Sequence, residues 1–259
     1  YDPSNLDITT GPGTTITLDI DGAKGEYLFA TGNATIDLFG FVSVTGGFGV
    51  EKKTSKIIVV SDFQATETRE TVTANLLTIG LANVSAFVGD SVSGLGLNLT
   101  GVDLAIALWS EVVLSGTPRK WTSVMGSIAS ATFSGVTGLG LTVTSAGLVV
   151  NKIAADNTVV DYVQNGSESA ATSLIVTVAP GETVTFSIDD NNGDYIQEVG
   201  VAMINLFDFV SVSGGFGVEK KTGQSIVLSD NTTATTNLLT IGLANVSAFV
   251  GDSVSGLGI

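Results

Sequence analysis

Two acidic turns carry the side chains best suited to chemistry in this chain. They read DIDGAKGE at 19–26 and SIDDNNGD at 187–194, and each sets carboxylates beside glycine. Clustered carboxylate oxygens on such a turn are ligands that a hard cation prefers, so the turns predict Ca²⁺, although their spacing is not that of an EF-hand. An ordinary polar hairpin tip is the alternative, because Asp, Asn and Gly favour such backbone geometry. The predicted ligands are Asp19, Asp21, Glu26, Asp189, Asp190 and Asp194.

A second group of residues suits ligand binding. Trp109 and Trp121 flank the segment SEVVLSGTPRK, which contains Arg119. An aromatic pair beside a loop offers flat apolar faces on which a sugar ring can stack. We therefore regard Trp109, Arg119 and Trp121 as candidate glycan-binding residues, with a packed corner of the core as the alternative.

The composition excludes several kinds of catalysis. The chain has no histidine and no cysteine, so neither a Ser-His nor a Cys-His nucleophile can form, and thiolate or imidazole metal sites are absent. Carboxylates remain for acid–base chemistry, but nothing in the sequence selects a pair of them. We therefore predict that the protein is not an enzyme.

Net charge narrows the classes of partner. Among 259 residues, 25 are acidic and 10 are basic, which gives a net charge of −15. Binding to nucleic-acid phosphates needs a basic surface, so nucleic acid is excluded as a partner, and an anionic membrane surface would repel the chain. No apolar run of about 18 residues is free of polar interruption, so we predict no membrane insertion.

The elements that would position these residues come from a repeat. The stretch NLLTIGLANVSAFVGDSVSGLG occurs twice, at 75–96 and at 237–258, without a single difference. Upstream, the segments that begin at Pro12 and Pro180 align without gaps at a period of 168 residues. Tandem duplication explains identity at polar as well as apolar positions. We divide the chain into a first full repeat, 1–174, and a partial second repeat, 175–259.

Alternating apolar residues predict long strands throughout the repeat. Apolar residues of one parity run through 36–50 and indicate one long strand or two collinear strands, with a bulge or a close backbone approach at Gly46 and Gly47. The related elements after Gly94 and Gly138 indicate equivalent strand starts 44 residues apart, and 102–113 is interpreted as a strand. We predict an all-β tandem repeat with a solenoid-like stacking of strands, or alternatively a string of β-sandwich domains.

The segments VSVSGGFGVEKKT, NLLTIGLANVSAFVGD, GLNLTGVDLAIAL and RKWTS carry a family resemblance. Together they resemble the tandem repeat regions of giant bacterial extracellular adhesin-like proteins of the RTX/LEPR-XLL type. This resemblance covers nearly the whole chain and implies an extracellular or cell-surface repeat region. It implies no catalytic residue, and the nonapeptide calcium motif found in many such proteins is missing here.

Repeat organisation leads to two functional hypotheses. The first is a structural protein that forms a filament, fibre or adhesin stalk by stacking or head-to-tail association of β-repeats. Because the second repeat is partial, we expect its exposed edge to be completed by a second molecule or by continuation of the same chain. The alternative is a surface-binding adhesin module whose partners are glycans.

Overall fold

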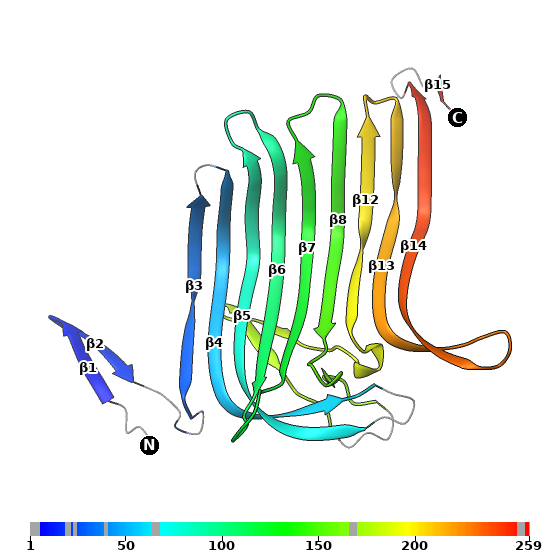
Figure 1. Cartoon of the computed structure of the whole chain (residues 1–259). Helices are drawn as coiled ribbons and strands as arrows, with labels where there is room; N and C mark the ends of the chain where they lie inside the picture. Colours follow the sequence, from blue (N-terminus) through cyan, green and yellow to red (C-terminus); the bar gives the residue numbers. More distant parts are fainter. Residues whose placement is uncertain are drawn as a thin grey trace.

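The computed structural model describes residues 6–18, 22, 25–38, 41–63, 68–165, 170–252 and 257–258 (Figure 1). The predicted all-β class is confirmed: the described residues form strands and contain no α-helix. None of their segments is a helix long and apolar enough to cross a membrane.

Ten antiparallel strands lie side by side in one open sheet, in the order β15-β14-β13-β12-β8-β7-β6-β5-β4-β3. Sequential strands are neighbours almost throughout, as short hairpin connections favour. Several strands are far longer than the five or six residues that are usual, because the apolar alternation runs without a break. Their bounds are β3 Tyr27–Leu38, β4 Val42–Ser61, β5 Arg69–Asp90, β6 Leu95–Glu111, β7 Lys120–Ser134, β8 Leu139–Lys152, β12 Tyr195–Leu206, β13 Val210–Val227, β14 Thr233–Asp252 and β15 Leu257–Gly258.

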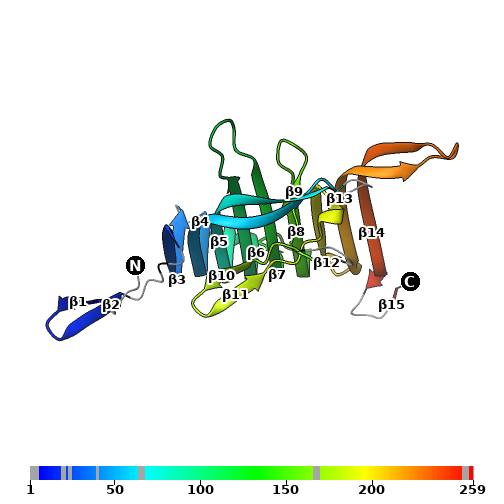
Figure 2. The ribbon, with the colours of Figure 1, turned by 90° about the horizontal axis from the view of Figure 1, so that it is seen from below.

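Two small hairpins stand apart from this row of strands. β1 (Leu6–Gly11) pairs with β2 (Thr14–Leu18), and β10 (Ile175–Ala179) pairs with β11 (Glu182–Thr185). Figure 2 shows β10 and β11 lying against one face of the large sheet, whereas β1 and β2 extend beyond the β3 edge. The two-residue strand β9 (Val159–Val160) pairs with the end of β4.

The two copies of the repeat fold alike down to the strand register. Tyr27 pairs with Lys53 in the first copy, and Tyr195 pairs with Lys221 in the second. Two register shifts between β4 and β5 recur at the corresponding places between β13 and β14. One of them lies opposite Gly46, but the extra residue belongs to β5, between Ala82 and Ser85. A Cβ on Gly46 would come within 2.8 Å of the Val84 Cα, so Gly46 marks a close backbone approach and does not itself form the bulge. The sheet is continuous between the copies, because β8 pairs with β12.

One expectation about the strands was wrong. The apolar parity of 36–50 indicated one strand or two collinear strands, but the chain reverses between Leu38 and Val42. Leu38 pairs directly with Val42, and Ile36 pairs with Val44, so the hairpin keeps all four residues on one face. Parity alone cannot distinguish a tight reversal from a straight strand, because both keep the same alternation.

Other local expectations are confirmed. β6 and β8 begin directly after Gly94 and Gly138, which both have positive φ, and β6 covers most of 102–113. The hydrophobic core lies on the face of the sheet that β10 and β11 cover. Its largest members are Trp109, Trp121, Tyr162, Phe186 and Ile188.

Candidate functional site

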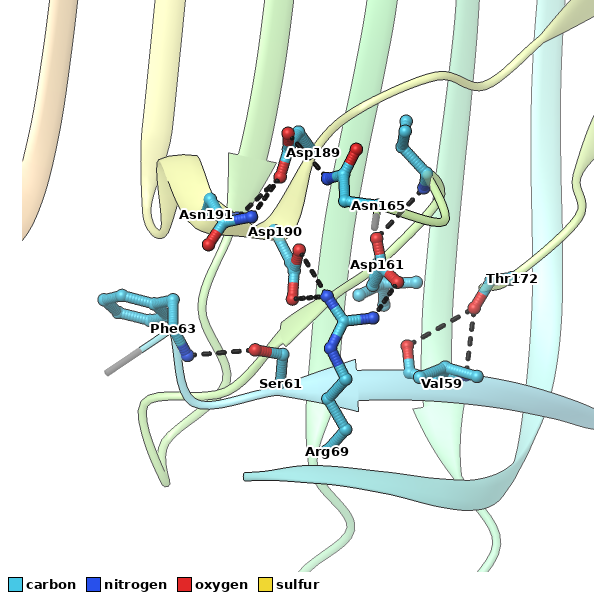
Figure 3. A network of polar contacts seen from close by, with 12 residues as sticks. Val59, Ser61, Phe63, Arg69, Asp161, Asn165, Thr172, Asp189, Asp190 and Asn191 are labelled. Atoms are coloured by element: carbon cyan, nitrogen blue, oxygen red, sulfur yellow. Dashed lines mark hydrogen bonds and ion pairs between the residues drawn. The ribbon is translucent and has the colours of Figure 1, made fainter. Parts of the chain in front are cut away.

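Arg69, the first residue of β5, holds two aspartates that come from distant parts of the chain (Figure 3). Its Nη1 donates to Asp161 Oδ2 at 2.7 Å, and its Nη2 donates to both carboxylate oxygens of Asp190 at 2.9 and 2.8 Å. Both aspartates are fully buried. Asp161 follows β9, and Asp190 opens a 3₁₀ helix, η2 (Asp190–Asn192). One guanidinium therefore joins the sheet to two segments of the layer that covers it.

Further hydrogen bonds fix the ends of these segments. Asp189 caps η2, because its Oδ1 accepts from the backbone N–H of Asn191 at 2.9 Å, and its Oδ2 accepts from Asn165 Nδ2 at 2.9 Å. Burial alone would raise the pKa of Asp189, but these hydrogen bonds outweigh it and lower the pKa. The Thr172 hydroxyl accepts from the Val59 N–H at 2.9 Å and so anchors the chain to β4.

The second acidic turn uses its carboxylates within the protein. Asp190 is held by Arg69, Asp189 caps η2, and Asp194 forms an ion pair with Lys152 at 3.1 Å. Each predicted ligand of this turn therefore has a different partner. Within the described ranges, no group of three or more acidic side chains is arranged to hold a metal ion.

At the first acidic turn, Asp19 and Asp21 lie outside the described residues. Glu26 lies within them and forms an exposed ion pair with Lys52 at 2.6 Å. The hydrogen bond from Lys52 lowers the pKa of Glu26. Calcium binding at 19–26 therefore stays a prediction.

Trp109 and Trp121 face each other across β6 and β7 and are both buried. Trp109 Nε1 donates to Tyr162 Oη at 2.9 Å, and Trp121 Nε1 donates to the Thr158 carbonyl at 3.1 Å. The indole rings thus belong to the core, which is the packed-corner alternative. In this arrangement neither ring offers a free face to a sugar.

Arg119, the third candidate ligand-binding residue, is surrounded by carboxylates. It donates from two nitrogens to the carboxylate of Glu111, at 2.9 and 2.7 Å, and from Nη1 to Glu70 and to Asp156. Its guanidinium also lies 5.3 Å from the centre of the Trp121 ring. Hydrogen bonding to Glu111 raises the pKa of Arg119 and lowers that of Glu111. Arg119 therefore closes the loop between β6 and β7 instead of presenting a free cation.

A chain of buried hydrogen bonds runs beneath the tryptophans. The hydroxyl of Tyr162 donates to Ser123 Oγ at 2.9 Å, and Ser123 donates to Asn151 Oδ1 at 2.9 Å. Asn151 Nδ2 then donates to the Val160 carbonyl at 2.9 Å. Burial raises the pKa of Tyr162, so the tyrosine stays neutral and can donate. This network fixes β9 and its surroundings against β7 and β8.

The β10–β11 hairpin rests on a patch of glycines in β4 and β5. A Cβ placed on Gly49 would come within 2.3 Å of the Thr177 carbonyl oxygen, and one on Gly80 within 2.4 Å of the same atom. Any side chain at either position would therefore push the hairpin away. Val176 and Val178 of β10 are buried by this contact. We call the surface formed by Gly47, Gly49, Thr78, Gly80 and Ala82 the hairpin seat.

The opposite face carries an apolar hollow of about 330 Å³ over β6, β7 and β8. Among its lining residues are Leu99, Val102, Ile128, Val143 and Leu148. Its few polar residues include Asp103 and Glu198. Such a lining suits contact with another apolar surface better than recognition of a hydroxyl-rich sugar.

Arg69 and Asp161, which join the covering segments to the sheet, were not among the residues predicted from the sequence. A signal was present nevertheless, because the chain has only two arginines and both prove to hold several carboxylates. A buried carboxylate requires such a partner. The small residues of GGFG at 46–49 were a signal of the hairpin seat. The sequence alone does not show that β10 is the segment that packs against them.

Comparisons of the chain with protein families, with curated proteins and with solved structures gave no match.

Proposed function

We propose that this protein is a structural, extracellular repeat scaffold in which successive repeats extend one β-sheet into a filament or stalk. One observation carries the proposal: two copies of the repeat have the same strand register and bulges, and β8 of the first copy pairs directly with β12, the first strand that the second copy adds to the large sheet. The joint between repeats is therefore an ordinary strand pair. A further repeat can be added in the same way without a new kind of contact.

This arrangement sets the distance by which each repeat lengthens the sheet. From β3 to β12, which are equivalent strands, the sheet advances by six strand positions. At about 4.8 Å for each neighbouring pair, one repeat lengthens the sheet by about 29 Å. A separate globular domain of this size would add about 40 Å, estimated from its radius of gyration. A continuous sheet and a string of separate domains thus predict different increments.

Composition is compatible with an extracellular location. A large sheet with exposed apolar residues needs charge to remain soluble, and the net charge of −15 supplies it. The chain has no cysteine, so its stability does not depend on the redox state of its surroundings. Ion pairs and backbone pairing join its segments instead.

The glycan-binding alternative receives less support. Its candidate aromatic residues, Trp109 and Trp121, are buried and hydrogen-bonded, and Arg119 is already paired with carboxylates. A glycan would have to bind elsewhere on the described surface.

The test is to lengthen the chain in whole repeats. A copy of residues 12–179 inserted before Pro12 recreates the natural Ala179–Pro180 junction, so the insertion introduces no foreign sequence. We expect small-angle X-ray scattering and electron microscopy to show an increase of about 29 Å for each added unit. Increments near 40 Å with visible joints would instead indicate separate domains and would contradict the continuous sheet.

A further inference from the structure

The β1–β2 hairpin is a second copy of the hairpin that covers the sheet. The pairs Asp7↔Thr17 and Ile8↔Ile16 correspond, 168 residues on, to Ile175↔Thr185 and Val176↔Val184. Both hairpins also have the same register shift one residue before the turn. β1–β2 therefore has the backbone pairing of a hairpin that occupies a seat.

The burial of the two hairpins differs sharply. Leu174 and Val176 are 5% and 0% exposed, whereas the equivalent Leu6 and Ile8 are 53% and 43% exposed. β10–β11 contacts β4, β5 and β6, whereas β1–β2 extends beyond the sheet edge (Figures 1 and 2). The apolar face of β1–β2 is thus left without the surface that its counterpart covers.

The second copy of the repeat carries an uncovered hairpin seat. Gly217 and Gly242 are equivalent to Gly49 and Gly80, with the same neighbours in sequence. Among the described residues, a Cβ on Gly242 would meet no atom within 4 Å, and one on Gly217 would meet only Val199, at 3.7 Å. The space that β10 fills in the first copy is therefore open in the second.

Neighbouring side chains show the same contrast. Leu76 is 2% exposed beneath the covering layer, and its equivalent Leu238 is 39% exposed. Thr78 is buried, whereas its equivalent Thr240 is exposed. Identical residues in an identical register differ because the first copy of the seat carries a hairpin and because β6 flanks β5 there, whereas the described part of β15 pairs with β14 only at Gly251 and Asp252.

We propose that the β1–β2 hairpin of one molecule docks on the seat formed by β13 and β14 of a second copy of this chain. This inference rests on the proposed scaffold function and identifies the contact that joins molecules end to end. The seat and β1–β2 lie at opposite ends of the sheet, so each molecule presents one donor and one acceptor (Figure 1). Such a contact is heterologous and extends into a filament unless the rotation closes it.

Cysteine cross-linking can capture the contact, because the natural chain has no cysteine. In the occupied seat, Ala179 Cβ lies 2.6 Å from the place of a Cβ on Gly47, and the equivalents of these residues are Gly11 and Gly215. A disulfide needs Cβ atoms about 3.8 Å apart, which a small shift supplies. We expect a mixture of the Gly11→Cys and Gly215→Cys proteins to form, on oxidation, a species of twice the 26.3 kDa chain mass.

Two further variants test whether the cross-linking requires docking on the seat. Gly242→Val in the Gly215→Cys chain should leave folding unchanged, because the site is open, but should abolish cross-linking, because a side chain there meets the β1 backbone. Val218→Cys is the matched control: Val218 follows Gly217 in β13 and points to the opposite face, so it should not cross-link to Gly11→Cys. Each single-cysteine protein is also oxidised alone.

The proposal is overturned if the mixture cross-links no more than the Val218→Cys control, or if Gly242→Val leaves the yield unchanged. Circular dichroism of each variant establishes that it is folded. This failure is separate from failure of the scaffold function, since the increment of about 29 Å in lengthened chains does not depend on docking between molecules.

Discussion

Replacing Arg69 with alanine should destabilise the protein far more than the same change at the other arginine, Arg119. Arg69 makes its three charged hydrogen bonds to Asp161 and Asp190, whose side chains are both fully buried. Removing the guanidinium leaves two carboxylates with neither water nor this cation beside them. Breaking one buried pair by removing a partner costs about 3–5 kcal/mol, so we expect a loss in free energy of unfolding of at least that size.

Arg119 provides the matched control. The two arginine side chains are about equally exposed, at 17% and 19%, but the partners of Arg119 reach water: Glu70 is 49% exposed, Asp156 is 37% exposed and Glu111 is 17% exposed. Exposed ion pairs contribute about 0.2–1 kcal/mol each, and its contact with Trp121 contributes about as much again. We therefore expect Arg119→Ala to cost about 1–2 kcal/mol, and Arg69→Lys to fall between the two alanine variants, because lysine keeps the charge without the bidentate fork.

Urea unfolding followed by tryptophan fluorescence measures these differences, because Trp109 and Trp121 lie in the same core. Coincidence with circular dichroism tests whether the transition is two-state. Hydrogen exchange should place the loss of protection in Arg69→Ala around 159–192. Equal losses for the two alanine variants would refute the argument that burial of the partner carboxylates sets the cost.

Three further predictions concern other features of the molecule. Gly80→Ala should destabilise by about 1–3 kcal/mol through overlap with the hairpin, whereas Gly242→Ala should be neutral or stabilising by about 0.5 kcal/mol; equal urea midpoints would contradict this. Burial and the neighbouring glutamates raise the pKa of both Tyr27 and Tyr195 to about 12, so the unfolded chain ionises first and stability should fall as pH rises from about 10 to about 12; replacing both with phenylalanine should reduce this fall in a urea titration, and the part that remains comes from Tyr162, whose pKa burial also raises. If 19–26 binds calcium, a chelator should lower the melting temperature and added calcium should restore it; an unchanged melting curve would remove calcium from this turn.

Much of the fold could be predicted because the patterns of apolar residues and glycines recur in both copies of the repeat. Alternation identified the long strands, and the 168-residue period identified which ones are equivalent. The close backbone approach at Gly46 and the strand starts after Gly94 and Gly138 followed from glycine placement. The hairpin between Leu38 and Val42 could not be predicted, because a tight reversal preserves the alternation on which the reasoning relied.

The candidate site was less predictable, because its residues meet only through the fold. Arg69 and Asp161 are 92 residues apart, and no local pattern relates them. Trp109 and Trp121 were correctly identified as neighbours, but burial depends on the covering layer, which the sequence does not locate. Leu76 and Leu238 illustrate the limit: their surrounding sequence is identical, and their burial is opposite.

The crosswise position of β10 bears on how the molecule resists force. Tension along the row of strands pulls on the hydrogen bonds between them, so neighbouring strands would separate one pair after another. β10 contacts β4, β5 and β6 together, so it acts as a brace that must detach before those strands can part. Within the described chain, the second copy of the seat carries no such brace. When a molecule is pulled from its two ends, β12, β13 and β14 should therefore separate first. The force at which they do so is set by their rate of unfolding under load.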